Sequence, residues 1–526
     1  MILSVRLLLD GPPDPGLEPY VLFRDQIRPV LEEKRSALDA MYDPAIGRPE
    51  IDPVLLTGIT MLQFMERLPD RQTIDRCRFD VRWRLALGLR ADADSVDASL
   101  LCRFRARMAE HAQARLVMDA GIEAMRRNGY LGRRRAVRID STHVLGQLAA
   151  VSRLACVRET IRLGLSFLAN WGNVSDWEPW LTRYADRNPA DLRKASATHL
   201  RTTMVQAGKD LREILARTNA LGKVVCEAEP VQLLRRVFQE QFETDATGEL
   251  TQRKTTPSDA VRNPHDPEAQ WSKKRSTEWV GYKLQVAETA PEQPRPRGEP
   301  TDAVITAMEI QPAITSDQNS IPPVLKAHEA LVGEPPETVF ADAGYINAPA
   351  LEYAETAGYE LCGPAAAPPH SGTRFGSDSF AVDISNRTAV CPNGKTSCEC
   401  DRIAESGRQT VYYYFAWSRS DCAACPLASR CLSKRKFDPR RTLQVGEKHM
   451  IVQARRQLCH SPEYQQRMRR RNGIEGTQSE CVRGYGARRC RYRGLARTSL
   501  QMQFVGAACN LRRWANRRCW LARKTA

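Results

Sequence analysis

The chain has 526 residues, a length that accommodates roughly two to four domains with substantial cores. Hydrophobic residues make up 42% of it and charged residues 27%, a balance that indicates a soluble globular protein rather than a disordered or membrane protein. No stretch approaches the ~18 uninterrupted apolar residues that a bilayer span requires, and Arg6 and Asp10 interrupt the opening segment before any signal-peptide cleavage site. We therefore expect a cytoplasmic protein without a membrane partner. Its net charge of +16 favours an anionic binding partner.

The first 130 residues are predicted to form a helical domain. Asp52 and Pro53 form an N-cap and first-turn pair ahead of apolar residues at helical spacing. A second helix is predicted after Asp97, and a third ends near Gly129, a residue type that commonly follows a helix C-terminus. We expect residues 1–130 to bind DNA or to mediate dimer contacts, and the sequence does not separate these two roles.

The pattern changes to that of a strand within residues 131–149. In "AVRIDSTHVLG" apolar residues alternate with charged ones, which predicts a first strand that carries Asp140. Residues 150–275 are then predicted to form a mainly helical insertion that ends in a polar linker. Its core is expected to contain three tryptophans, namely Trp171, Trp177 and Trp180.

Residues 276–380 are predicted to contain most of a central sheet. Strand patterns occur in "EWVGYKLQVAET", "AVITAMEIQPAI", "ETVFADAGYI" and "GYELCGPAAA", and "IPPVLKAHEAL" has the pattern of a helix. With the first strand, the order is three strands, a helix, a strand, a helix and a strand. This order predicts an α/β core.

Residues 381–450 form a section rich in cysteine. Six of the 16 cysteines in the chain lie in "CPNGKTSCEC" and "CAACPLASRC". Disulfides are not expected in a large chain without an export signal. The candidate ligands for a tetrahedral zinc ion are Cys391, Cys400, Cys422, Cys425 and Cys431, with Cys398 as an alternative to Cys400. The other interpretation is a small subdomain of reduced, metal-free thiols.

Residues 451–526 carry nearly all of the net positive charge. They contain 18 Lys and Arg against 3 Asp and Glu, a net charge of +15, and are predicted to be helical. Each basic group that neutralises a phosphate releases counterions, and the interleaved aromatic residues suit stacking on exposed bases. We therefore expect this tail to bind DNA; the alternative is an arginine-rich helix surface that only improves solubility.

Three carboxylates are candidates for a metal site. Asp140 and Asp342 each end an apolar strand pattern, and strand ends are where α/β proteins place ligands. Glu475 stands almost alone among the arginines of the tail, four residues after Arg471. Because Mg²⁺ prefers oxygen ligands, these groups could hold two ions that perform in-line displacement at phosphorus. The alternatives are two turn caps and a salt bridge between Arg471 and Glu475.

These motifs resemble those of the DDE transposases of bacterial insertion sequences, in the branch with a Tyr-x2-Arg-x3-Glu-x6-Lys signature. "LPDRQTIDRCRFDVRWRLALGL" resembles their N-terminal domain, "RIDSTHV" and "FADAGYI" their two Asp motifs, and "WVGYKLQVAET" their second strand. "RNGIEGTQSECVRGYGARRCRYRGLART" resembles the Glu motif, and the cysteine section resembles one found before it in relatives. Two signature positions differ, because Met468 stands in place of Tyr and Val482, next to Arg483, in place of Lys.

The resemblance implies a fold, a chemistry and partners. The fold is an RNase H-like core with a mixed five-stranded sheet and a helical insertion, preceded by an all-α domain and accompanied by a small Cys-rich subdomain. Asp140, Asp342 and Glu475 are implied to be catalytic and to bind two Mg²⁺ or Mn²⁺ ions. The implied partners are double-stranded DNA, as terminal inverted repeats and target, and further copies of the chain in a dimer or larger assembly that is nucleoid-associated on DNA.

Several basic residues are candidates for contacts with the DNA backbone. They are Arg471, Lys283, Arg483, Arg488, Arg489 and Arg491. His143, three residues after Asp140, is a further candidate for orienting water or a phosphate, although a structural histidine is the more ordinary role.

Two other functions fit the same sequence. One is a metal-dependent nuclease on the same core, which cuts DNA without joining strands. The other is a non-catalytic DNA-binding regulator derived from a transposase, for which three retained carboxylates would be unnecessary.

Overall fold

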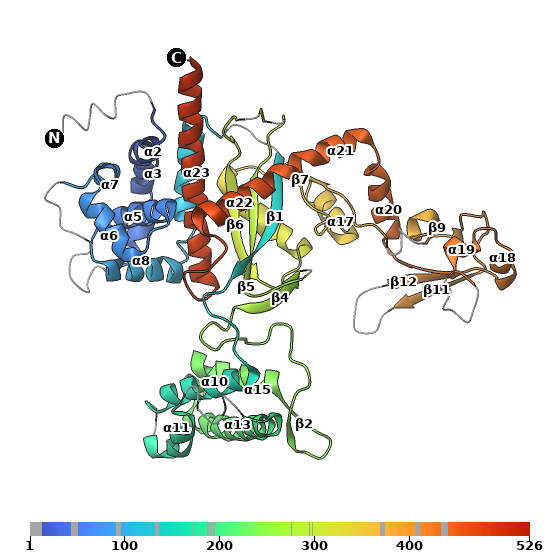
Figure 1. Ribbon diagram of the computed structural model, residues 1–526, viewed down its shortest axis with the longest axis horizontal. Helices are drawn as coiled ribbons and strands as arrows, with labels where there is room; N and C mark the ends of the chain where they lie inside the picture. Colours follow the sequence, from blue (N-terminus) through green and yellow to red (C-terminus); the bar gives the residue numbers. More distant parts are fainter. Residues whose placement is uncertain are drawn as a thin grey trace.

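The computed structural model describes residues 13–525, apart from residues 44–50, 91–95, 132–135, 172, 187–188, 190–191, 193–194, 275, 294, 297, 369–373, 405–410 and 433–439. The opening segment with Arg6 and Asp10 lies outside this part. The chain forms a group of N-terminal helices, a central mixed sheet, a helical lobe and a lobe rich in cysteine (Figure 1). None of the described helices is long and apolar enough to cross a membrane.

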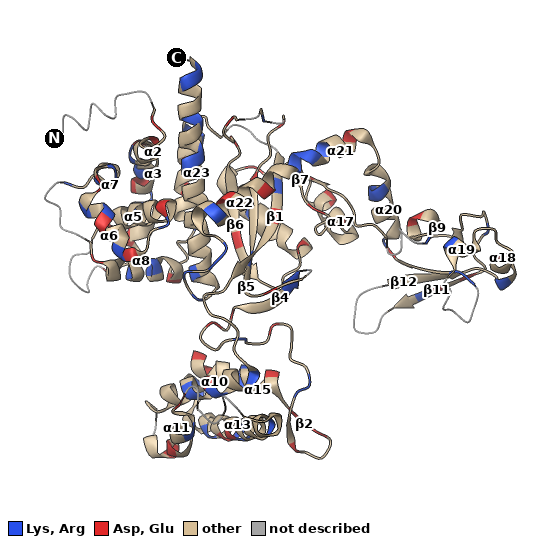
Figure 2. Ribbon diagram, viewed as in Figure 1, with Lys and Arg blue, Asp and Glu red and all other residues tan. Residues whose placement is uncertain are grey.

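The N-terminal helices form one group beside the central sheet. They are α2 (Glu18–Leu22), the π-helix η1 (Phe23–Ile27), α3 (Arg28–Glu33), α4 (Arg35–Asp39), α5 (Pro53–Glu66), α6 (Asp70–Phe79), α7 (Val81–Leu87), α8 (Ala98–Glu110) and α9 (Leu116–Arg127). The side chains of Asp52 and Asp97 accept hydrogen bonds from N–H groups in the first turns of α5 and α8, which confirms both predicted starts. Figure 2 shows acidic as well as basic residues on these helices.

The central sheet is mixed. Its strands are β1 (Ala136–Leu145), β4 (Gln270–Lys274), β5 (Thr277–Thr289), β6 (Ile305–Pro312), β7 (Thr338–Phe340) and β8 (Glu360–Cys362). β5 pairs antiparallel with β1 and β6, whereas β7 is parallel to β1 and β8 is parallel to β7. The predicted helix between the third and fourth core strands is α16 (Ile321–Val332), and α17 (Ala348–Thr356) precedes β8.

The sheet has six strands, so the prediction of five is wrong. The first part of β5 pairs with β4, and the remainder of the same edge pairs with β6. β5 has 13 residues and β6 has eight, so β4 supplies hydrogen-bond partners to a strand edge that β6 does not reach. The segment predicted as a polar linker therefore contributes a strand.

The insertion after β1 is a helical lobe with its own core. It contains α10 (Arg153–Leu168), the 3-10 turn η2 (Val174–Asp176), α11 (Glu178–Tyr184), α13 (Ala197–Thr218), the 3-10 turn η3 (Asn219–Leu221), α14 (Lys223–Glu227), α15 (Glu229–Gln241) and the hairpin β2 (Phe242–Thr244) and β3 (Leu250–Gln252). Trp177 and Trp180 are buried in its core, as predicted. Trp171 is 41% exposed, because it follows the end of α10, so its predicted place in the core is wrong.

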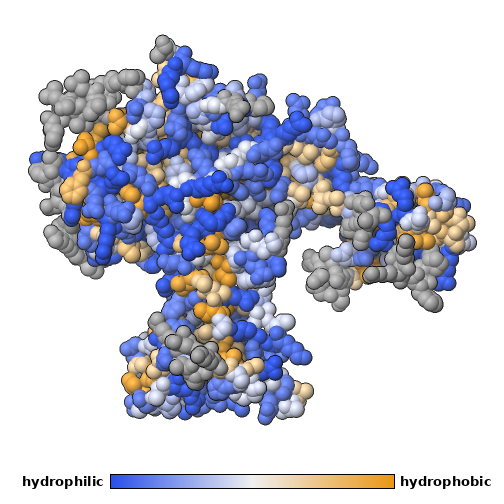
Figure 3. All heavy atoms as spheres, in the orientation of Figure 1, coloured by the Kyte–Doolittle hydropathy of each residue, from blue (hydrophilic) through white to orange (hydrophobic). Residues whose placement is uncertain are grey.

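The cysteine-rich section is a second lobe, and Figure 3 shows both lobes attached by narrow connections. Its elements are the 3-10 turn η5 (Ser377–Ser379), β9 (Ala381–Asp383), β10 (Thr388–Val390), β11 (Glu399–Ala404), β12 (Val411–Ala416), α18 (Arg419–Ala423), α19 (Ala428–Cys431) and β13 (Thr442–Gly446). β9 pairs with β10, and β11, β12 and β13 form an antiparallel sheet.

The basic tail returns the chain to the central sheet. It contains α20 (His449–Leu458), α21 (Pro462–Met468), the 3-10 turn η6 (Arg469–Asn472), α22 (Gly473–Tyr485) and α23 (Leu495–Thr525). α23 lies between the N-terminal helices and the sheet, where Phe504 stacks on Phe64 with 5.6 Å between ring centroids. The Asn510 amide bonds both the N–H and the C=O of Ile305, at 2.9 and 2.8 Å. α23 thus joins the helical group to β6.

Candidate active site

Asp140 lies in the middle of β1 and is only 7% exposed. Its Oδ1 accepts a hydrogen bond of 2.7 Å from the backbone N–H of Ser141. Burial, together with the negative charge of Asp342, raises the pKa of Asp140 to about 6 against the opposing effects of the Ser141 N–H and of Arg471. A carboxylate that is so poorly solvated gains from the approach of a cation.

Asp342 follows the end of β7, beside Asp140. In the parallel pair of β1 and β7, Arg138 is opposite Phe340. Asp140 and Asp342 are each two residues past this paired position, on neighbouring segments. The Oδ1 atom of Asp342 accepts a hydrogen bond of 2.9 Å from the N–H of Gly344. The two aspartates predicted from the sequence are therefore brought together by strand pairing.

Asp317 is another carboxylate at this place, and the sequence analysis missed it. Its Oδ1 accepts hydrogen bonds from the hydroxyl of Ser141 at 3.1 Å and from the ammonium of Lys283 at 3.2 Å. A Cβ on Gly344 would stand 3.0 Å from Asp317 Oδ2 and 3.1 Å from Asp342 Oδ1. Glycine thus leaves a space between two carboxylate oxygens. The available signal was that Asp317, like Asp342, closely follows a strand end, whereas β1 continues past Asp140 to Leu145, so the strand end predicted at Asp140 is wrong.

Glu475 lies in the first turn of α22, and 68% of its side chain is exposed. Arg471, one turn earlier, donates to Glu475 Oε1 at 3.3 Å and to Asp140 Oδ2 at 3.2 Å. The salt bridge considered as an alternative role for Glu475 is present. The same guanidinium also links Glu475 to Asp140, so the helix and the strand meet at this arginine.

A buried ionic network holds α22 against the sheet. Glu288, which is fully buried, accepts hydrogen bonds from Arg138 at 2.6 Å, from Thr477 at 2.6 Å and from Arg513 at 2.9 Å. A Cβ on Gly473 would overlap the guanidinium of Arg138. Glycine is therefore required here by close packing, although it costs about 1 kcal/mol in a helix.

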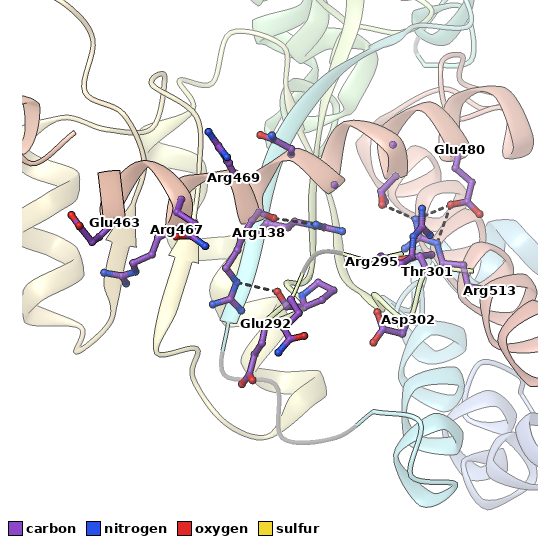
Figure 4. A pocket seen from close by; sticks show the side chains of 18 residues that line it. Arg138, Glu292, Arg295, Thr301, Asp302, Glu463, Arg467, Arg469, Glu480 and Arg513 are labelled. Atoms are coloured by element: carbon purple, nitrogen blue, oxygen red, sulfur yellow. Dashed lines mark hydrogen bonds and ion pairs between the residues drawn. The ribbon is translucent and has the colours of Figure 1, made fainter. Parts of the chain in front are cut away.

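A cavity of about 980 Å³ lies beside α22, and most of its charged lining is basic. The arginines that line it are Arg138, Arg295, Arg467, Arg469, Arg470 and Arg513. Figure 4 shows Arg467 and Arg469 extending from α21 and η6, and Arg138 lying beneath them. Arg470 donates to the carbonyl oxygens of Ala290 and Pro291, whereas Arg469 is exposed. Only some of these arginines are available to a ligand.

Two of the predicted DNA contacts, Lys283 and Arg488, are engaged close to Asp140. Lys283 bonds Asp317 and the carbonyl of Thr315, and 16% of its side chain is exposed. Arg488 donates to Thr142 and to the carbonyl of His143, at 3.1 and 2.6 Å. These two side chains therefore support the residues around Asp140.

The remaining candidates differ in exposure. Arg491 donates to the carbonyl of Leu68 at 2.9 Å and packs over the Phe64 ring. Arg483 and Arg489 are exposed. His143 packs against Trp279 with 5.2 Å between ring centroids, and burial lowers its pKa, as is typical of a structural histidine.

The donor set suits a hard divalent cation. Asp140, Asp342 and Asp317 offer carboxylate oxygens at one end of the sheet, and oxygen is the ligand that Mg²⁺ prefers. Within the described ranges, no three His, Cys, Asp or Glu side chains are already gathered as metal ligands. For Glu475 to reach such a site, the Arg471 guanidinium has to leave its position between the carboxylates.

Comparison with known proteins identifies two segments. Residues 17–107 match a family described as a transposase domain (DUF772), and residues 390–515 match one described as a transposase DDE domain. The second match contains Glu475, whereas Asp140 and Asp342 precede it. No curated protein and no solved structure matches the chain. The two matches, one at each end of the chain, are both to transposase families, and they support the predicted resemblance to a DDE transposase of an insertion sequence.

Proposed function

We propose that the protein binds the terminal inverted repeats of its insertion sequence and catalyses metal-dependent cleavage and transfer of DNA strands. The observation that carries this proposal is the meeting of Asp140, Asp342 and the helix of Glu475 at one end of the sheet. The order β6-β5-β1-β7-β8, with two parallel pairs, supports an RNase H-like core to which β4 has been added.

The geometry supports the following catalytic roles. Asp140, Asp342 and Glu475 would hold two Mg²⁺ or Mn²⁺ ions, which when bound make water, and then a 3′-hydroxyl, reactive toward phosphorus. Because the pKa of Asp140 is raised to about 6, this side chain is largely deprotonated at neutral pH and becomes a poorer ligand in acid. The Lys283 to Asp317 pair holds the Ser141 hydroxyl beside Asp140.

Arg471 has a further role in this proposal. Its guanidinium contacts two carboxylates, and once these bind cations it is free to contact another anion. We expect this anion to be a DNA phosphate next to the scissile bond. The exposed arginines Arg469, Arg483 and Arg489 extend the same basic surface along η6 and α22 and beyond it.

The partners and domains are assigned on this basis. Double-stranded DNA is bound as terminal repeat and as target, and joining two ends requires a dimer or larger assembly. The N-terminal helices bind DNA or mediate dimer contacts, and the sheet with α22 forms the catalytic core. A zinc ion in the cysteine-rich section would be structural and take no part in the chemistry.

The test is a cleavage and joining assay on a duplex that carries the element's own terminal repeat. Wild type is expected to cut and to join strands only with Mg²⁺ or Mn²⁺, while Asp342→Asn and Glu475→Gln bind the duplex without cutting it. Cleavage without joining would favour a nuclease. Good binding with an inactive wild type would favour a DNA-binding regulator.

A further inference from the structure

Four cysteines line a single cavity in the cysteine-rich lobe, which lies between Asp342 and Glu475 in the chain. Cys391, Cys422, Cys425 and Cys431 line one cavity of about 20 Å³. They come from the end of β10, from α18, from the turn after it and from α19. A space of this size admits about one water-sized group. A ligand bound between the four thiols would therefore have to be a single small ion or atom.

The backbone around the first thiol forms a tight turn. The N–H of Cys391 donates to the carbonyl of Lys395, and the N–H of Gly394 donates to the carbonyl of Cys391, both at 2.8 Å. Gly394 has φ +74°, a conformation that favours glycine. This turn fixes the direction from which Cys391 enters the cavity.

The other three thiols come from one short segment. Cys422 and Cys425 are joined by a backbone hydrogen bond in a Cys-x-x-Cys turn, and Cys431 follows six residues later. The Cys422 sulfur accepts a hydrogen bond of 3.3 Å from the N–H of Arg441. Such bonds stabilise a sulfur that carries negative charge.

The remaining cysteines of the section are placed elsewhere. Cys398 is exposed and bonds the carbonyl of Ala416, and Cys400 lies on β11 opposite Phe415. Neither lines the cavity. The structure therefore selects four of the thiols that the sequence offered and leaves out Cys400.

The surroundings of the four thiols include one fixed positive charge. The Arg441 guanidinium lines the same cavity and is held there by bonds to the carbonyls of Cys431 and Phe375, each at 2.9 Å. Four thiolates together require a positive ion.

The lobe also needs an additional source of stability. Its core contains only nine buried hydrophobic residues, and all 16 cysteines of the chain are free thiols, so no disulfide supports it. Small domains with so little core are commonly stabilised by a disulfide or a metal. A structural zinc ion contributes folding free energy directly.

We propose that Cys391, Cys422, Cys425 and Cys431 bind one Zn²⁺ ion as a closed tetrahedral site that stabilises the cysteine-rich lobe. Soft sulfur ligands in this number select zinc over the hard cations of the carboxylate site. Among the described residues no three potential ligands are already gathered as a metal site, so the ion would have to draw the thiols together.

The test measures metal content in the full-length protein, purified with a reductant and without added zinc. We expect one zinc per chain in wild type and in Cys398→Ser, whose thiol lies outside the cavity. Cys425→Ser and Cys431→Ser should lose the zinc, with a dissociation constant weakened by at least about 100-fold, since outer-shell changes alone reach 10- to 100-fold.

A second measurement does not depend on whether the variants fold. Metal-stripped wild type is titrated with Co²⁺, which should produce thiolate-to-cobalt absorption that Zn²⁺ abolishes. Zinc-free wild type without cobalt absorption, or equal zinc loss in Cys398→Ser and Cys431→Ser, would overturn the proposal. Both readouts concern bound metal, so they are independent of DNA cleavage.

Discussion

The carboxylate site and the thiol site differ in the atoms that would bind a metal and in the size of the structure around them. The first gathers oxygen atoms at the end of a sheet of six strands, next to exposed arginines and a cavity of about 980 Å³. The second gathers sulfur atoms around about 20 Å³ in a lobe with a small core. The cavity near the carboxylates is therefore far larger than the one that the thiols line. In our proposal the first site serves chemistry and the second serves stability.

The largest expected effect distinguishes the two sites by activity. Asp342→Asn should lower DNA cleavage by at least about 10²- to 10³-fold, the effect of removing one charge-stabilising group from an active site. Zinc content should stay unchanged, because the thiol site shares no residue with it. The matched control is Asp401→Asn on the exposed strand β11. Equal activity in both variants would contradict the assignment of Asp342.

A second prediction concerns what supports the carboxylate site. Arg513→Leu removes one of the two guanidinium groups that pair with the buried Glu288, and it should lower the free energy of unfolding by up to about 3–5 kcal/mol. The control Arg497→Leu removes an exposed pair with Glu110 and should cost less than about 1 kcal/mol. Denaturant unfolding measures both. Similar values would show that the network does not hold α22 in place.

A third prediction uses the pH dependence of Asp140. Its pKa is raised from 3.8 to about 6, so between these values the native state retains a proton that the unfolded state has released. The stability contributed by this group therefore falls as pH rises through that window. Asp140→Asn should stabilise the protein at pH 7 without divalent metal by roughly 1–3 kcal/mol.

The same variant sharpens the contrast with the thiol site. Added Mg²⁺ should raise the melting temperature of wild type at pH 7 and leave that of Asp140→Asn unchanged, whereas removal of zinc should lower both. A variant that is no more stable than wild type in metal-free buffer would show that Asp140 is not destabilised by its burial.

The smallest effect separates two adjacent arginines. Arg469 is exposed, and Arg470 bonds two backbone carbonyls. Arg469→Ala should weaken binding of duplex DNA severalfold and lower the slope of log K against log salt by about 0.9. Arg470→Ala should instead lower stability and leave that slope unchanged. An unchanged slope in Arg469→Ala would remove this residue from the DNA interface.

The sequence predicted features that depend on local patterns. The helix starts at Asp52 and Asp97 require only a side chain and the next turn. Asp140 and Asp342 were found because each lies at or just past an apolar strand pattern, and parallel pairing then brings them together. The network around Glu288 involves residues distant in sequence, so no local pattern indicated it.

The features that escaped prediction depend on contacts between distant segments. Asp317 gains its place from Ser141 and Lys283, and β4 becomes a strand only because β5 extends beyond β6. Arginines of the tail look alike in sequence, yet Arg513 is buried in a network while Arg483 is exposed. A charge of +15 in that segment therefore overstates the surface available to DNA.

The most direct test asks whether Asp342 touches the metal that acts on DNA. Asp342→Cys replaces a hard ligand by a soft one, which Mg²⁺ accepts poorly and Mn²⁺ accepts better. We predict that this variant is inactive in strand cleavage with Mg²⁺ and recovers part of its activity with Mn²⁺, while Asp342→Ala recovers none. Equal activity of Asp342→Cys with both ions, or equal recovery by Asp342→Ala, would contradict a metal-dependent carboxylate site at this position.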